Sequence, residues 1–104
     1  MKIQFNTDKN INGDERNENH FTSIIADSLE RYDSHITRIE VHLSDENGQK
    51  EGQDDILCTL EARLEGKQPT VVSCHANSIE SALSGALDKL KAALKTILGR
   101  MQNH

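Results

Sequence analysis

The stretch from Asn77 to Gly99 limits the possible folds of this chain more than any other stretch. Its apolar residues recur at intervals of three and four, which is the period of an α-helix with one apolar face. We expect Asn77 to cap the first turn, with Glu80 reaching back to it, and Gly99 to end the helix. An apolar face of this length must be buried, so the rest of the chain has to form the surface that covers it. The residues of this face are Ile79, Ala82, Leu83, Ala86, Leu87, Leu90, Leu94, Ile97 and Leu98.

Size and composition allow only a small core. The chain has 104 residues, of which 35% are hydrophobic and 3% aromatic, so we expect one domain over residues 1–104 with an aliphatic core. Its formal net charge of −5 argues against general attraction to nucleic acid or to anionic membranes, although a local basic patch remains compatible with it. Neither a membrane span nor a secretory signal is visible, so we expect a cytoplasmic protein without membrane association.

Alternating apolar and polar residues predict four strands, at residues 2–6, 38–43, 56–65 and 71–76, with the third the longest. Between the first two strands, apolar residues from Phe21 to Tyr32 are spaced three and four apart, which predicts a helix that ends before Asp33. Either Asp14 or Asn17 could cap this helix. A strand–helix–strand unit of this kind makes its two strands parallel.

The predicted fold class is therefore α+β. The order β-α-β-β-β-α gives a two-layer sandwich, with a four-stranded mixed sheet and both helices on one face. The polar segment 44–55 is expected to form a loop, and the sequence assigns it no role.

The last two strands form a hairpin, and its register can be argued from the pattern. A loop of three or five residues centred on Gln68 sets Leu64 opposite Val72 and keeps both apolar runs on one face. That register separates Cys58 from Cys74 along the sheet, so both are expected to be free thiols.

No pattern of catalytic or metal-binding residues stands out. Of the five histidines, only His42 and His75 are expected on one sheet face, whereas a metal site needs three or four converging ligands. Cys74 and His75 are adjacent in a strand and point to opposite faces, so they cannot form a nucleophile–base pair. No glycine-rich phosphate loop is present. We therefore expect no metal, no cofactor and no enzymatic activity.

Basic residues gather at the end of the chain. Lys89, Lys91, Lys95 and Arg100 occur without an intervening acid, and Lys91 and Lys95 are expected to share a helix face. Cations at a helix C-terminus complement the helix dipole and aid solubility, and the local pattern alone favours this structural interpretation. The same residues could also form a patch for an anionic partner.

The order of elements resembles one bacterial family, the hibernation-promoting factors and ribosome-associated inhibitors, also called sigma-54 modulation proteins. The resemblance extends from Ile3 to about Arg100, in the short single-domain form. It rests on LERYDSHITRIEVHLS and ALSGALDKLKAALKTILGR, and within them on the His-Ile-Thr at residues 35–37 and the Asp-Lys-Leu at residues 88–90.

The resemblance implies a function. Members of this family bind the small ribosomal subunit near the decoding centre, block messenger and transfer RNA sites, and silence ribosomes in stationary phase or stress. It thus implies a cytoplasmic translation inhibitor whose partner is the small subunit and its ribosomal RNA. The implied RNA-binding residues are Lys89, Lys91, Lys95 and Arg100, together with Arg31 on the first helix.

The chain also departs from the family, whose helices carry more lysine and arginine. The last helix has Ala92, Thr96 and Leu98, and the first has Asp27 and Glu30. The alternative hypothesis is therefore a regulatory protein-interaction module on the same fold that has lost RNA binding and contacts a protein partner.

Overall fold

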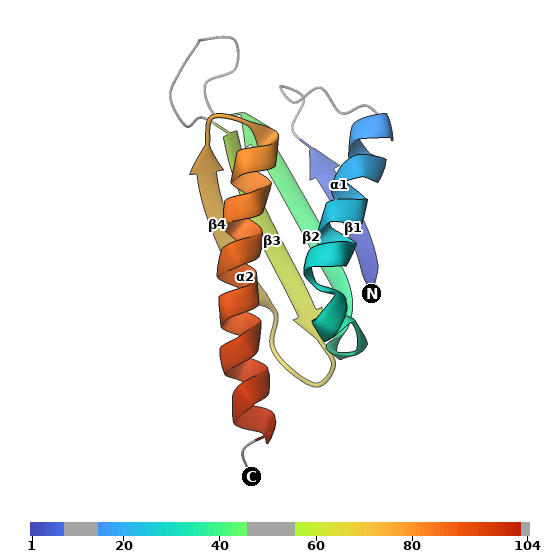
Figure 1. The fold of residues 1–104 in the computed structure, drawn as a ribbon, viewed down its shortest axis with the longest axis vertical. Coiled ribbons are helices and arrows are strands. Elements are labelled where there is room, and N and C mark those ends of the chain that lie inside the picture. Colours follow the sequence, from blue (N-terminus) through green and yellow to red (C-terminus); the bar gives the residue numbers. More distant parts are fainter. Residues whose placement is uncertain (8–14, 46–55, 103–104) are drawn as a thin grey trace.

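The computed structural model describes residues 1–7, 15–45 and 56–102, and Figure 1 shows their arrangement. The elements follow the predicted order, with one short 3-10 helix added after the first α-helix. They are β1 (Lys2–Thr7), α1 (Glu15–Ser28), the 3-10 helix η1 (Glu30–His35), β2 (Ile36–Asp45), β3 (Ile56–Leu64), β4 (Thr70–Ala76) and α2 (Ile79–Gln102).

The strands form one mixed sheet in the order β1-β2-β3-β4. β1 pairs with β2 in parallel, and the other two pairs are antiparallel. Both α-helices lie on the same side of this sheet, with α2 over β3 and β4 and α1 toward β1 and β2 (Figure 1). The α+β two-layer sandwich that the sequence predicts is thus confirmed.

The core lies between the sheet and the two helices. The side chains of Leu90 and Leu94 on α2 are 0% exposed, as the apolar face predicted, and α1 contributes Phe21 and Ile25, with Leu29 following directly after its end. Among the described residues, no polar or charged side chain is buried in this core. Burial of apolar area therefore dominates the stability of the sandwich.

The ends of α2 differ from the prediction. The backbone N–H of Ser81 donates a hydrogen bond to Ser78 Oγ at 3.1 Å, so Ser78 caps the helix and Asn77 precedes the cap. A serine hydroxyl one residue closer to the helix serves the same purpose as the predicted asparagine. Gly99 does not end the helix, because α2 continues to Gln102 and the backbone at Gly99 is not left-handed.

The first helical segment also ends differently. α1 begins at Glu15, so Asn17 lies inside the helix and is not its cap, while Asp14 lies outside the described residues. The α-helix stops at Ser28. Tyr32 is buried as predicted, but it belongs to the 3-10 helix η1 and not to a continued α-helix. A spacing of three residues between Leu29 and Tyr32 suits a 3-10 helix as well as an α-helix, which explains the error.

β2 contains a bulge that the sequence did not predict. Ile36 pairs with Leu64 and Arg38 pairs with Arg63, which leaves Thr37 as the extra residue. The Thr37 hydroxyl donates to the carbonyl oxygen of Arg63 at 3.0 Å. The extra residue changes the alternation, so that Ile36 faces the core on the same side as the later apolar residues of the strand.

β2 is also longer than predicted. It has 10 residues against 9 in β3, so the prediction that β3 is the longest strand is wrong. Ser44 and Asp45, the first residues of the predicted loop, are the last residues of β2, and the rest of that loop, 46–55, lies outside the described residues.

The predicted register of the β3–β4 hairpin differs from the observed one by four residues, so this prediction is wrong. The directly opposed pairs are Cys58 with Cys74, Leu60 with Val72, and Ala62 with Thr70. The predicted faces are still correct, because side chains alternate with a period of two and a shift of four preserves the face.

The turn geometry explains the register. The N–H of Lys67 donates to the carbonyl oxygen of Leu64 at 3.2 Å, which closes a tight turn around Glu65 and Gly66. Gly66 has a φ of 73°, in the left-handed region that glycine adopts without strain. The chain therefore reverses at Gly66 and not at Gln68.

The outer face of the sheet is polar and carries an ion-pair network. Arg63 Nε lies 3.0 Å from Glu61, Arg63 NH2 lies 3.7 Å from Glu40, and Arg38 NH2 lies 3.8 Å from Glu40. Hydrogen bonding to Glu40, and then to Arg63, lowers the pKa of Glu61 below its ordinary value. Of these ion pairs, Arg63–Glu40 links β3 to β2, on the side away from the helices.

Candidate functional site

A groove opens where η1, the β3–β4 turn and the C-terminal half of α2 meet. It consists of two adjoining cavities that share His35 and Leu98, and we call it the His35 groove. The larger cavity, of about 370 Å³, is lined by Arg31, Tyr32, His35, Lys95, Leu98 and Gly99. The smaller cavity, of about 180 Å³, is lined by Ser34, His35, Leu64, Glu65, Lys67 and Leu98.

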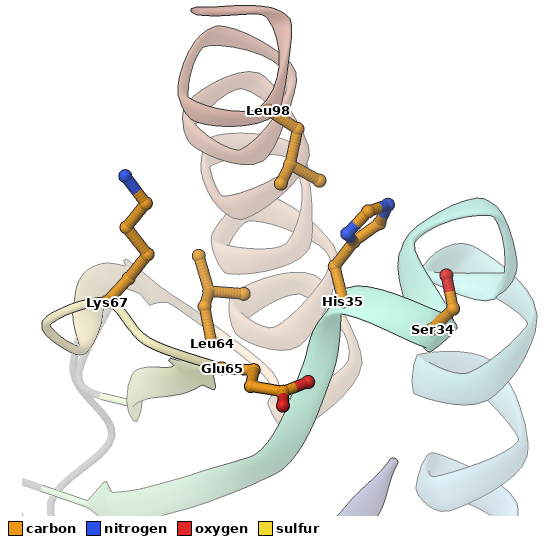
Figure 2. Close-up of a pocket in the computed structure, with 6 residues that line it drawn as sticks. All are labelled: Ser34, His35, Leu64, Glu65, Lys67 and Leu98. Atoms are coloured by element: carbon orange, nitrogen blue, oxygen red, sulfur yellow. The ribbon is translucent and has the colours of Figure 1, made fainter. Parts of the chain in front are cut away.

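The local structure brings His35 to the centre of this groove. His35 is the last residue of η1 and is exposed, whereas the next residue, Ile36, is 3% exposed and anchors the start of β2 in the core. Figure 2 shows Leu98 reaching from α2 toward His35 and Leu64, with Lys67 on the turn at one side and Ser34 at the other. The apolar side chains of Leu64 and Leu98 thus lie between the polar side chains that line the groove.

Arg31 is held in place by its neighbour. Its guanidinium carbon lies 5.5 Å from the centre of the Tyr32 ring, and Tyr32 itself is buried at 9% exposure. An arginine over an aromatic ring is oriented by the ring while its N–H groups remain available to a ligand. Across the larger cavity, the exposed Lys95 extends from α2.

The groove is cationic although the whole chain is acidic. The groove has three basic residues, Arg31, Lys67 and Lys95, and Glu65 is the one acid among its described lining residues. Within the described part of the chain, no carboxylate forms an ion pair with any of these three cations. Unpaired cations on a concave surface create a positive potential that attracts an anionic group.

Of the four predicted RNA-binding residues whose side chains the structure describes, Arg31 and Lys95 meet in this groove. Lys89 Nζ donates to the carbonyl oxygen of Ser73 at 2.7 Å, so this side chain lies along β4. Lys89 and Lys95 are six positions apart in the helix, which places them about 120° apart around the axis.

Lys91 is also absent from the described lining of the groove. Lys91 is half-buried, and its Nζ lies 3.7 Å from Oδ1 of Asp88. The side chain of Arg100 lies outside the described residues. Lys91 and Lys95 do come from the same side of the helix, as their spacing predicted, but only Lys95 reaches the groove.

Sequence reasoning missed Tyr32, Lys67 and the role of His35 in the groove. His35 was already visible as part of the His-Ile-Thr pattern, and in the structure each residue of that pattern has a separate position. His35 lines the groove, Ile36 is buried and Thr37 holds the bulge. Lys67 could be placed here only from the correct hairpin register, because the turn at Gly66 brings it toward η1.

The two histidines predicted on the outer face of the sheet, His42 and His75, are not on neighbouring strands. His42 is paired with Thr59, and His75 with Leu57, so β3 separates the two. Among the residues that the structure describes, no group of three or more His, Cys, Asp or Glu side chains could hold a metal ion. No described helix has both the length and the apolar character that a bilayer span needs.

Comparisons with known proteins identify the relatives of this fold. The family model of the sigma 54 modulation protein / S30EA ribosomal protein family matches residues 5–102. Among solved structures, the N-terminal domain of Protein Y from Thermus thermophilus superposes with a TM-score of 0.73 at 17% identity, over 93% of this chain and 99% of that one. A ribosomal subunit interface protein from Coxiella burnetii has a TM-score of 0.70 at 13% identity, over 95% and 99%.

At these identities, the two solved structures establish the fold alone. No curated protein that we compared matches the sequence of the chain.

Proposed function

Because the chain belongs to the sigma 54 modulation protein / S30EA ribosomal protein family, we propose that it binds the ribosome and inhibits translation. We place its action at the small subunit, in the cytoplasm, as a hibernation factor that silences ribosomes under stress. The observation that carries this proposal beyond family membership is the cationic His35 groove in a chain with a net charge of −5. The partner that we assign to this groove is the phosphate backbone of ribosomal RNA.

The chemistry of the groove suits RNA phosphate. The guanidinium of Arg31 can donate two parallel hydrogen bonds to phosphate oxygens, and Lys95 adds a point charge across the cavity. A volume of about 370 Å³ is at the lower end of the range for small-ligand sites, so it admits part of a nucleotide and not a duplex. Binding would follow the shape of a folded RNA, as is common for protein–RNA recognition, with few charges contributing to affinity.

The mechanism that we propose is occlusion. A domain seated at the decoding region of the small subunit excludes messenger and transfer RNA by occupying their space. This role needs a stable surface with oriented cations and no reacting group, so we propose a binding function and not catalysis.

The alternative is a regulatory protein-interaction module that has lost RNA binding. The specific observation in its favour is the exposed surface of the helices outside the groove, where Ala92 and Thr96 on α2 are uncharged. Asp27 on α1 and Glu30 on η1 are exposed acids and would repel phosphate. If the groove does not bind RNA, these helices favour a protein partner.

Co-sedimentation with purified ribosomal subunits at low salt tests the proposal. We expect the parent protein to pellet with the small subunit and not with the large one. Lys95→Glu should strongly reduce pelleting, because it introduces a negative charge opposite Arg31. The matched control is Lys2→Glu, which makes the same charge change at an exposed residue of β1. In this strand, Ile3 and Phe5 pack against the core and Lys2 does not.

Each outcome has a distinct meaning. If Lys95→Glu binds as the parent does, RNA contact lies elsewhere on the protein. If both variants lose binding equally, the effect is one of net charge and not of the groove. If the parent itself never pellets with either subunit, the alternative function replaces the proposed one.

A further inference from the structure

Two cysteines face each other across the β3–β4 hairpin. Cys58 and Cys74 are directly opposed in the antiparallel register, and both point toward the helices. Directly opposed Cα atoms of antiparallel strands are about 4.5–5.5 Å apart. Disulfides bridge Cα atoms about 4.4–6.8 Å apart, so the backbone of this hairpin already has the spacing that a disulfide needs.

The two thiols, which are free in this structure, differ in access. Cys58 is 0% exposed, whereas Cys74 is half-buried on the edge strand. Burial, with a smaller contribution from the neighbouring Cys74 thiol, raises the pKa of Cys58 to about 12. The contribution of Cys74 to that pKa is consistent with two sulfur atoms that lie close together.

Among the described residues, only one weak hydrogen bond is seen at the sulfur of Cys74, which packs beside a glycine. Its Sγ lies against Gly85 of α2, where an added Cβ would overlap it, and donates weakly to the carbonyl oxygen of His75 at 3.5 Å. This hydrogen bond is long and involves a poor donor, so rotation of the Cys74 side chain toward Cys58 sacrifices little.

We propose that Cys58 and Cys74 are a modification site at which a small disulfide oxidant closes a reversible cross-strand bond. The inference does not depend on the proposed function. Gly85 and Lys95 are ten residues apart in α2, or about 15 Å along the helix axis, so the bond forms away from the His35 groove.

The reaction proceeds in two balanced steps. The Cys74 thiolate attacks one sulfur of the oxidant RSSR, a mixed disulfide forms at Cys74, and RS⁻ leaves and takes up a proton. The Cys58 thiolate then attacks Cys74 Sγ, the protein disulfide forms, and the second RS⁻ leaves and is protonated. Two thiols are thus oxidised while one RSSR is reduced to two RSH.

The difference in access sets the order of these steps. The half-buried Cys74 can meet a small oxidant, whereas the buried Cys58 can meet only the sulfur opposite it. The second step requires the Cys58 thiolate, which is scarce at neutral pH because its pKa is raised to about 12. Closure should therefore be slow at neutral pH and should accelerate about tenfold per pH unit below that pKa.

Timed oxidation with bis(2-hydroxyethyl) disulfide tests the proposal on the folded protein. Samples are quenched in acid, unfolded, alkylated and weighed by mass spectrometry. We expect a monomer lighter by two hydrogens in which neither cysteine is alkylated, and reduction should restore both thiols. The rate of closure should rise with pH.

Two single variants separate the steps. Cys58→Ala should stop at the mixed disulfide on Cys74, and Cys74→Ala should leave Cys58 unmodified until the protein is unfolded. The proposal is overturned if the parent stops at the same mixed disulfide as Cys58→Ala. It is equally overturned if both cysteines of the parent are still alkylated when the Cys58→Ala adduct is complete.

Discussion

Replacement of Gly85 by alanine tests the packing of α2 against Cys74 of β4. Gly85 lies in the interior of α2, and an added Cβ would overlap Cys74 Sγ and lie 3.3 Å from Cys74 Cβ. The same change at Gly99, in the same helix, would meet no atom within 4 Å. The two glycines therefore form a matched pair in which helix propensity favours alanine but only one position has room for it.

The two contributions have opposite signs at Gly85. Alanine in a helix interior is more stable than glycine by about 0.8–1.0 kcal/mol, while overpacking a well-filled contact costs about 1–3 kcal/mol. The net expectation for Gly85→Ala is a loss of roughly 0–2 kcal/mol. Gly99→Ala should instead stabilise the protein by up to about 1 kcal/mol, less at the end of the helix where the chain frays.

Urea unfolding of both variants under reducing conditions gives these differences directly. Adding Cys74→Ala to Gly85→Ala removes the overlapping sulfur, so the two substitutions should couple favourably by about 1–2 kcal/mol in a double-mutant cycle. If Gly85→Ala alone stabilises the protein as much as Gly99→Ala does, the packing of α2 against Cys74 described here is wrong.

Two further predictions concern the core and the outer sheet face. Leu90→Ala should lower the free energy of unfolding by about 2–5 kcal/mol in urea, because Leu90 is 0% exposed, and an unchanged midpoint would contradict its burial. The lowered pKa of Glu61 stabilises the folded state above its ordinary carboxyl pKa, and this contribution is lost as pH falls through the folded-state value. The urea midpoint of the parent should thus fall more steeply than that of Glu61→Gln below about pH 5, and parallel curves would refute the linkage.

The sequence predicts the architecture because the apolar patterns are long and regular. The face of α2 and the strict alternation in β2 and β3 determine which side chains are buried, and the buried residues match. The order of elements in the structure is also the one that the family resemblance implied. One error arises because a residue can substitute for its neighbour, as Ser78 does for Asn77 at the start of α2.

Register and site geometry depend on turn conformation, which the pattern leaves open. A hairpin reversed at Gln68 or at Gly66 buries the same residues, so the apolar pattern cannot decide between the two turns. The choice nevertheless determines whether Cys58 meets Cys74 and where Lys67 stands. For the same reason, only the folded chain shows that Lys95 shares a groove with η1.

The salt dependence of binding to purified small subunits tests the central claim, that the cations of the His35 groove contact RNA phosphates. Each phosphate contact contributes about 0.7–0.9 to the slope of log affinity against log salt, so Arg31, Lys67 and Lys95 together predict a slope of roughly 2–3. Arg31→Gln with Lys95→Gln should lower the slope by about 1.4–1.8 by the same rule and weaken binding at low salt. A double variant that keeps both the affinity and the slope of the parent would contradict the claim.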